Sequence, residues 1–242
     1  MDPTALTPFP TNNIHRALCV VAHPDDLEYG VSAAVSHWVS QGIEVSYLLL
    51  THGEAGMQRH PDEVGPLRAE EQRRACAAVG VTQLTMLNHP DGMLMPTLDL
   101  RRDIAREIRR VRPEVVLTMA WDVIVPWGLN QADHRAAGLA TLDAVRDADN
   151  TWVFPELAEA EHLPKWGATW FLVAGSATPT HGIEVSADDV TAAVTSLSEH
   201  QAYLADLPDH PAPADFLPSS LAAQGELLGV PSAFCVQAFH LH

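Results

Sequence analysis

A histidine and two aspartates lie within four residues of one another, in the segment AHPDDLE at positions 22–28. His23 and Asp26 are three positions apart, so a single turn can direct both side chains to one point, with Asp25 close by. An imidazole nitrogen and a carboxylate oxygen are ligands that suit zinc or a similar divalent cation. A catalytic zinc typically has three protein ligands and one open position, so a third ligand must come from elsewhere in the chain.

The same segment also has a purely structural interpretation. Asp25 or Asp26 could cap a helix that begins near Leu27, with His23 as an incidental residue of the turn. The second acidic residue and the 13 histidines of the chain favour a metal site over this helix cap.

The segment NQADHR at positions 130–135 supplies the candidate third ligand. His134 can reach a cation held by His23 and Asp26 if the strands that precede the two segments are neighbours in a sheet. Asp133 could orient a ligand through a hydrogen bond. The alternative is again structural, because an aspartate in the first turn is favourable to the helix dipole and His134 could be exposed.

Short apolar runs that alternate with helical patterns must position these residues. The predicted strands are residues 17–22, 45–51, 82–87, 114–120, 169–174 and 183–185. The predicted helices are residues 27–39, 66–79, 98–111, 132–148 and one long final helix, which Ser186 and Asp189 cap and which ends near Asp206. Strands that alternate with helices indicate a parallel sheet with helices on both faces, and sites in such sheets lie at the carboxyl ends of the strands.

The expected architecture is one α/β domain with three layers (α/β/α), Rossmann-like, around a mostly parallel sheet. Residues 1–14 are rich in Pro, Thr and Asn and are expected to form a flexible arm. Residues 15–207 form the predicted domain. Residues 208–242 are expected to be a Pro-rich extension with little periodicity that packs on the same domain. A dinucleotide site is not expected, because no GxGxxG motif follows the first strand.

Composition narrows the classes of partner. The 242 residues include 14 Lys and Arg against 31 Asp and Glu, a formal net charge of −17. Such a surface repels phosphates, so neither a nucleic acid nor a membrane is an expected partner. Three scattered cysteines without a CxxC pair exclude a disulfide scaffold and predict a reducing compartment inside the cell. Because the N-terminal stretch lacks a signal-peptide pattern and no apolar run could span a bilayer, a cytoplasmic protein is expected.

Together, AHPDDLE and ADHRAAG (residues 132–138) resemble the PIG-L/LmbE-like family of zinc-dependent N-acetylglucosaminyl deacetylases, which includes the deacetylase and the thiol-conjugate amidase of the mycothiol pathway. Three shorter segments agree: THGE at 51–54, RAEE at 68–71 and PDG at 90–92. The resemblance runs from about Ala17 to about Leu204.

The resemblance implies a role for each matching position. It implies three zinc ligands, His23, Asp26 and His134. It implies one general base and one carboxylate that orients the site, Asp25 and Asp133. It implies three residues that contact the sugar, Glu54, Arg68 and Asp91. Oligomers are common in that family, so a homo-oligomer is a candidate assembly.

Gln131 is a departure from the family pattern. The family commonly reads His-Pro-Asp-His here, and its first histidine helps to polarise the carbonyl and stabilise the oxyanion. Gln131 cannot cycle a proton, but its amide can donate an N–H to an oxyanion, so we keep it among the catalytic candidates. His52, His181 and His200 are alternatives for the missing acid.

The resemblance therefore predicts a zinc-dependent hydrolase that removes an acetyl group from an N-acyl amino sugar or glycoside. The metal would activate a water molecule as the nucleophile and Asp25 would act as general base. Another divalent transition metal could replace zinc. The alternatives are an amidase for a thiol-conjugate or antibiotic-type amide, and a metal-binding relative without catalysis, which Gln131 favours.

Overall fold

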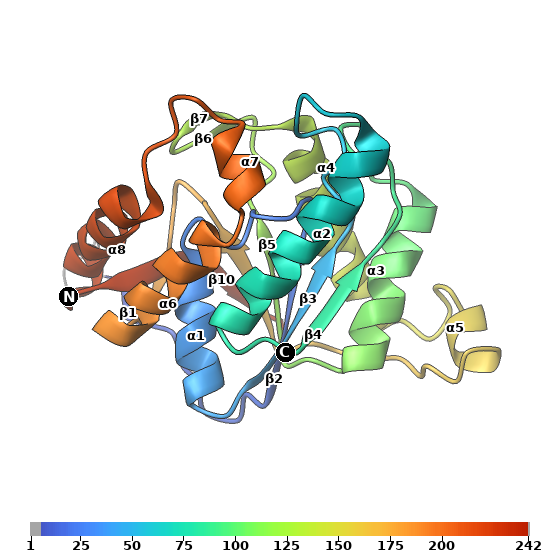
Figure 1. Cartoon of the computed structure of the whole chain (residues 1–242). Helices are drawn as coiled ribbons and strands as arrows, with labels where there is room; N and C mark the ends of the chain where they lie inside the picture. The colour runs from blue at the N-terminus through green and yellow to red at the C-terminus, as the bar shows by residue number, and fades with distance from the viewer. Residues whose placement is uncertain (1–5, 242) are drawn as a thin grey trace.

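An eight-stranded sheet forms the centre of the fold (Figure 1) in a computed structural model that describes residues 6–241. From edge to edge the strands are β1 (Thr7–Pro8), β9 (His181–Glu184), β10 (Ala233–His240), β8 (Trp170–Ala174), β5 (Val115–Met119), β2 (Arg16–Val21), β3 (Glu44–Leu49) and β4 (Gln83–Met86). Strand β10 is antiparallel to both of its neighbours, and every other pair is parallel. The predicted α/β fold with a mostly parallel sheet is confirmed.

Helices cover both faces of the sheet and complete the three layers (Figure 1). One face carries α1 (Val31–Ser40), α2 (Pro61–Ala78), α6 (Ala187–Ser198) and α8 (Pro213–Leu228). The other face carries α3 (Leu98–Val111) and α4 (Ala132–Ala148). Shorter elements are α5 (Glu156–Glu159), α7 (Gln201–Ala205) and the hairpin β6–β7 (Ile124–Val125 and Gly128–Leu129).

Strand β2, which leads into the segment with His23, Asp25 and Asp26, is apolar at almost every position because both of its faces are buried. Cys19 and Val21 pack into the core beneath α1, whereas Leu18 and Val20 pack into the core beneath α3 and α4. All four side chains have no exposed surface. A parallel strand covered on both faces needs apolar residues at every position, and this places its carboxyl end rigidly between two cores.

The first helix begins later than predicted. It starts at Val31 rather than Leu27, and residues 24–30 form successive turns instead. Asp25 has a left-handed backbone (φ 89°), and the carboxylate of Asp26 accepts a hydrogen bond from the backbone N–H of His23. This closed turn is incompatible with a helix, so neither aspartate caps α1.

Helix α2 begins at Pro61, five residues before the predicted start at Pro66. His60 caps it by accepting a hydrogen bond from the N–H of Asp62. Pro66 lies inside the helix, where it forfeits one backbone hydrogen bond.

The final predicted helix is two helices, so the prediction of one continuous helix was wrong. Helix α6 has the expected capping box at Ser186 and Asp189, but it ends at Ser198. His200 is fully buried and lies between α6 and α7 with a non-helical backbone. Its imidazole faces Glu28, and the N–H of Ala202 donates to Glu71, so packing against two buried carboxylates breaks the helix.

The Pro-rich C-terminal segment forms two elements that were not predicted from the sequence, helix α8 and strand β10. Helix α8 starts with Pro213 and runs through Pro218, with Leu217 and Leu221 buried. Strand β10 inserts between β8 and β9. At the other end of the chain, residues 1–5 of the predicted arm lie outside the described residues, and β1 pairs with β9.

We predict that Asp189→Ala destabilises the fold because Asp189 joins α6 to α1. Its carboxylate accepts hydrogen bonds from the N–H and hydroxyl of Ser186 and from the hydroxyl of Ser36. Chemical unfolding should show a loss of about 1–2 kcal/mol at neutral pH. Asp188→Ala, in the same helical turn but exposed, should cost only a few tenths. Equal losses would contradict the assignment.

The difference in the free energy of unfolding between wild type and Asp189→Ala should depend on pH, with a sign that follows from the pKa of Asp189. Burial opposes ionisation of Asp189, but hydrogen bonds from Ser186 and Ser36 and the charge of His37 hold its pKa below the usual value. A depressed carboxyl pKa gives stability that is present above the unfolded pKa of about 3.9 and is lost as the pH falls through the folded value. The difference between wild type and Asp189→Ala should therefore shrink below about pH 4.

Candidate active site and metal centre

The predicted site residues converge at the carboxyl edge of the sheet. The turn after β2, the loops after β3 and β4, and the first turn of α4 surround a cavity of about 1130 Å³. Eight of the nine predicted residues line it: His23, Asp25, Asp26, Arg68, Asp91, Gln131, Asp133 and His134. Strands β2 and β5 are neighbours, as the proposed third ligand requires.

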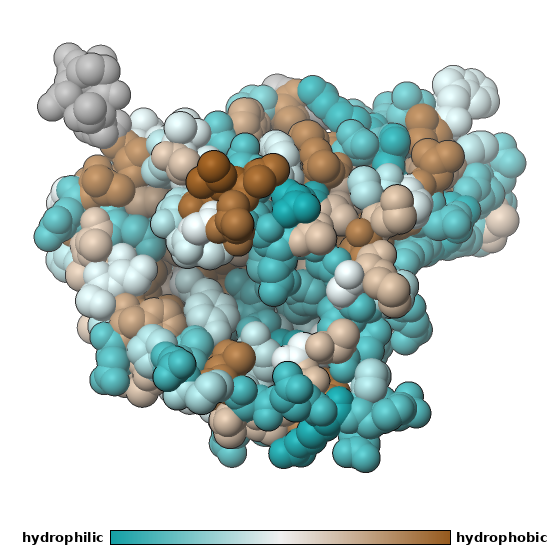
Figure 2. All heavy atoms as spheres, turned by 90° about the horizontal axis from the view of Figure 1, so that it is seen from above, coloured by the Kyte–Doolittle hydropathy of each residue, from teal (hydrophilic) through white to brown (hydrophobic). Residues whose placement is uncertain are grey.

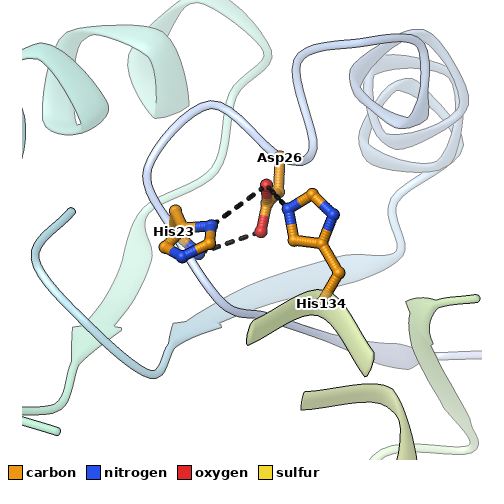
Figure 3. A group of neighbouring side chains, drawn as sticks. All are labelled: His23, Asp26 and His134. Atoms are coloured by element: carbon orange, nitrogen blue, oxygen red, sulfur yellow. Dashed lines mark hydrogen bonds and ion pairs between the residues drawn. The ribbon is translucent and has the colours of Figure 1, made fainter. Parts of the chain in front are cut away.

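His23, Asp26 and His134 point at one another (Figure 3). The Nε2 atom of His134 lies 2.9 Å from Oδ1 of Asp26, and the Nδ1 atom of His23 lies 3.6 Å from the same oxygen. The two imidazole rings are 5.3 Å apart between centroids. Asp26 is 7% exposed and His23 is 8% exposed, so the group lies in the cavity floor rather than on the outer surface.

Neighbouring side chains fix which nitrogen of each histidine is available. The side-chain amide of Asn130 donates to the carbonyls of Ala120 and Asp122, so its Oδ1 accepts from Nδ1 of His134 at 3.1 Å. The Nε2 lone pair of His134 is then directed at the cluster. Hydrogen bonds of this kind commonly set the tautomer of a metal-ligating histidine.

The opposite nitrogen of His23 is held by two other carboxylates. Its Nε2 atom lies 3.0 Å from Asp91 and 3.4 Å from Asp133. Asp133 also accepts the backbone N–H groups of Gly92 and Leu94. Asp133 therefore orients His23 and the loop after β4 together and does not cap its own helix.

Two groups among the described residues could hold a metal ion, and they share His23. In the group with Asp91 and Asp133, both carboxylates already accept backbone N–H groups. In the group with Asp26 and His134, Oδ1 of Asp26 faces two imidazole nitrogens and only Oδ2 accepts a backbone N–H. The second group fits a divalent cation better, with the two-nitrogen, one-oxygen donor set of catalytic zinc sites.

The electrostatics of this group favour a positive charge at its centre. Burial alone disfavours the charged forms of both Asp26 and His23. Nevertheless His134 and His23 hold the pKa of Asp26 well below its usual range, and Asp26 raises the pKa of His23 to about 12. A proton or a divalent cation between these groups supplies that charge.

Asp25 lies beside the cluster and does not belong to it. Its Oδ1 accepts from Arg68 at 2.9 Å, and its N–H donates to the side-chain carbonyl of Gln72. Burial raises the pKa of Asp25, while the Arg68 guanidinium opposes the shift. Asp25 is thus a buried carboxyl that faces the cavity and has a raised affinity for a proton.

Arg68 is tightly enclosed. Its guanidinium donates to the carbonyls of Pro24 and Gly53 and lies 4.0 Å above the ring of Tyr203. A side chain at Gly53 would overlap it, and Gly53 also has a positive φ of 64°. Arg68, the predicted sugar contact, therefore also orients Asp25, and its side chain is only 2% exposed.

Glu54 does not line the cavity. Its two oxygens accept the N–H groups of His52 and Asp91 and so brace the loops after β3 and β4 against each other. Gln131 faces the cavity as the N-cap residue of α4, and its side chain makes no capping hydrogen bond.

The three alternative histidines lie away from the cavity lining. His52 faces Asn88, His181 lies on β9, and His200 is buried against Glu28. Sequence reasoning assigned no role to Asn130, Gln72 and Tyr203, which the structure places around the site. The only sequence signal was spacing, since Asn130 and Gln72 each lie four positions from a predicted site residue.

The chain matches the family model described as GlcNAc-PI de-N-acetylase (PIG-L) over residues 18–145, which span β2 to α4. The chain belongs to the PIG-L family. It is 34% identical over 139 residues to diacetylchitobiose deacetylase of Thermococcus kodakarensis, covering 56% of this chain and 51% of that protein. It is 30% identical over 160 residues to 1D-myo-inositol 2-acetamido-2-deoxy-alpha-D-glucopyranoside deacetylase of Acidothermus cellulolyticus, covering 54% and 53%.

The chain thus spans about half the length of the curated relatives that it matches. Among solved structures, the N,N'-diacetylchitobiose deacetylase of Pyrococcus horikoshii superimposes with a TM-score of 0.84 at 20% identity, over 96% of this chain and 86% of that one. This PIG-L member therefore shares the deacetylase fold beyond the segment that the family model matches. Within residues 6–241, no helix has the length and apolar character needed to cross a membrane.

Proposed function

We propose that this chain is a metal-dependent N-deacetylase that removes the acetyl group of an N-acetylated amino sugar or glycoside. The observation that carries the proposal is the arrangement of His23, Asp26 and His134 around one point, with the buried Asp25 carboxyl beside them in the same cavity. The two relatives named above, which are deacetylases of acetylated amino sugars, support it.

The residues that would hold the cation are His23, Asp26 and His134, and their nitrogen and oxygen donors suit Zn²⁺. When bound, the cation would polarise the amide carbonyl and lower the pKa of a water molecule. Asn130, Asp91 and Asp133 keep the two imidazole rings in the required orientation.

Asp25 is the proposed general base. Its carboxylate accepts a proton from the attacking water and returns it to the amine nitrogen as the C–N bond breaks. Burial raises its pKa, which makes proton capture more favourable, and Arg68 keeps the carboxylate oriented. Tyr203 stays a neutral hydroxyl, because burial and the adjacent Asp25 raise its pKa.

Gln131 is the proposed oxyanion donor. It lines the cavity three positions before His134, and its side-chain amide makes no capping hydrogen bond to α4. Asp91 and Arg68 border the part of the cavity proposed for the sugar. Glu54 is proposed to act there indirectly, through the backbone N–H of Asp91.

The test of substrate class is free-amine release from a panel of amides by the zinc-loaded protein. The panel contains N-acetylglucosamine, N,N'-diacetylchitobiose, an N-acetylglucosaminyl inositol, N-acetyl amino acids and an amide of a thiol conjugate. Release from the amino sugars that Asp25→Asn abolishes is the expected result. Release confined to the thiol conjugate would favour the amidase alternative, and release from amino acids alone would contradict the proposal.

A metal-binding relative without catalysis is the second candidate, and Gln131 is the feature that favours it. Gln131→His restores the family pattern without altering the proposed ligands. If the wild type binds zinc but releases no amine, whereas Gln131→His releases it, the site is a hydrolase site that Gln131 has silenced.

The expected reducing, cytoplasmic location is likewise a proposal. It is supported by Cys19, Cys76 and Cys235, which are all free and buried.

A further inference from the structure

The cavity has two chemically different halves. The charged lining residues come from the turn after β2, from α2, from the loop after β4 and from the start of α4. The lining residues that follow β8, and those of α8 and β10, include no charged side chain. This wall contrasts with the net charge of −17 of the whole chain.

Large aromatic and aliphatic side chains within and beside that second half line a region that we call the apolar compartment, which also borders the uncharged polar side chains Ser176, Ser220 and Gln224. Met119, Trp127, Phe216, Leu227 and Phe234 line it. Viewed from above, the molecule is hollowed near its centre, with hydrophobic side chains beside the hollow (Figure 2). Leu227 is 53% exposed and Trp127 is 57% exposed, so these two lining residues leave much apolar surface accessible to water.

The indole ring of Trp127 lies directly against the backbone at Gly175. A side chain at Gly175 would overlap this ring, and Gly175 has a positive φ of 73° in the turn after β8. Phe216 of α8, which also lines the cavity, stacks on Tyr29 with 6.0 Å between ring centroids, and His210 hydrogen-bonds the Tyr29 hydroxyl. These contacts fix the positions of two side chains that line the cavity, Trp127 and Phe216.

The cavity is also larger than an acetylated sugar needs. Its volume of about 1130 Å³ exceeds the range of roughly 300–1,000 Å³ typical of pockets that bury drug-sized ligands. An acetylated monosaccharide at the charged half would leave the apolar compartment filled with water against exposed aliphatic and aromatic carbon, an arrangement that favours an apolar ligand group.

We propose that the apolar compartment binds an alkyl chain of the substrate, so that the preferred substrate is an amino sugar with an aliphatic substituent. This inference rests on the proposed deacetylase function and adds the substrate class. Most of the compartment lies beyond residue 145, outside the segment matched by the family model, so this specificity belongs to the chain's own C-terminal elements.

An alkyl chain can come from two sources, the acyl group on the nitrogen or the aglycone of the glycoside. One series therefore varies the acyl group of a glucosamine methyl glycoside from acetyl to butanoyl, hexanoyl and octanoyl. The other keeps the acetyl group and varies the aglycone from methyl to butyl, hexyl and octyl. In the favoured series kcat/KM should rise by about fourfold for each methylene buried, until the compartment is filled.

Leu227→Gln tests the location of the chain. It should reduce the ratio of kcat/KM between the longest and shortest substrates of the favoured series by roughly 16- to 64-fold, since the contacts of two to three methylenes are lost. The control is Leu98→Gln at the start of α3. Leu98 is 65% exposed and lies outside the cavity lining, so this substitution should leave the ratio unchanged. A ratio that is unchanged in Leu227→Gln would overturn the proposed location.

Calorimetric titration separates this inference from the proposed function. Methyl, butyl, hexyl and octyl glycosides of N-acetylglucosamine, and methyl glycosides with the longer acyl groups, are titrated into zinc-loaded Asp25→Asn protein. Affinity that rises with chain length, with a more negative heat capacity change, supports the compartment even if no substrate is turned over. Turnover and affinity that are both independent of chain length in both series would overturn it.

Discussion

His134→Ala should lose the bound cation. The variant removes one of three ligands and leaves Asp26 with a single imidazole partner, His23. Removal of a residue that merely orients a ligand typically weakens metal binding roughly 10- to 100-fold, so loss of a ligand itself should weaken it by more than about 100-fold. Zinc content after dialysis, and competition against a chelator with known affinity, measure the change.

The control for this variant is His37→Ala. His37 also faces a carboxylate, with its Nδ1 atom 3.3 Å from Asp189, but it lies on α1 outside either candidate metal group. This control should keep a full equivalent of zinc. Retention of a full equivalent by His134→Ala, with an unchanged affinity, would remove His134 from the ligand set.

Asp25→Asn should keep the cation and lose turnover. Asn matches the shape of Asp and tolerates the left-handed backbone at this position (φ 89°), whereas most residues would strain it. The amide cannot accept a proton as the carboxylate does, and general base catalysis typically contributes about 10²- to 10⁴-fold. We therefore expect kcat to fall by at least about 100-fold, with KM changed little.

Zinc content and the pH profile complete this test. A variant that only disturbed folding would lose zinc and stability together, whereas a lost base removes the acidic limb of the kcat/KM profile and leaves the metal bound. Asp188→Asn, an exposed carboxylate on α6, is the matched control. Unchanged turnover in Asp25→Asn would contradict the role of Asp25 as base.

The sheet was predictable because its central strands carry an unmistakable signal. Residues 17–22 and 45–51 are apolar at nearly every position, as buried parallel strands require, and they fall on β2 and β3. Strand β10 gave no such signal. It is an antiparallel strand near the sheet edge, and its last four residues, 237–240, are all at least partly exposed. Only its partners β8 and β9 define it.

The convergence of the site was predictable from strand order. Segments that follow neighbouring parallel strands meet at one edge, so His23 and His134 were expected to lie together, and they do. The contacts that tune them were not predictable, because they depend on tertiary packing. Gln72 reaches the N–H of Asp25 from α2, and Asn130 reaches His134 only because two backbone carbonyls fix its amide.

The most direct test of the central claim is acetate release from an N-acetylated amino sugar by metal-depleted protein to which Zn²⁺ is returned stepwise. We expect negligible release without metal and a rate that rises and saturates at one equivalent of zinc. Asp25→Asn titrated in the same way should bind that equivalent and stay inactive. Equal release before and after metal depletion, or activity in zinc-loaded Asp25→Asn equal to wild type, would contradict the account.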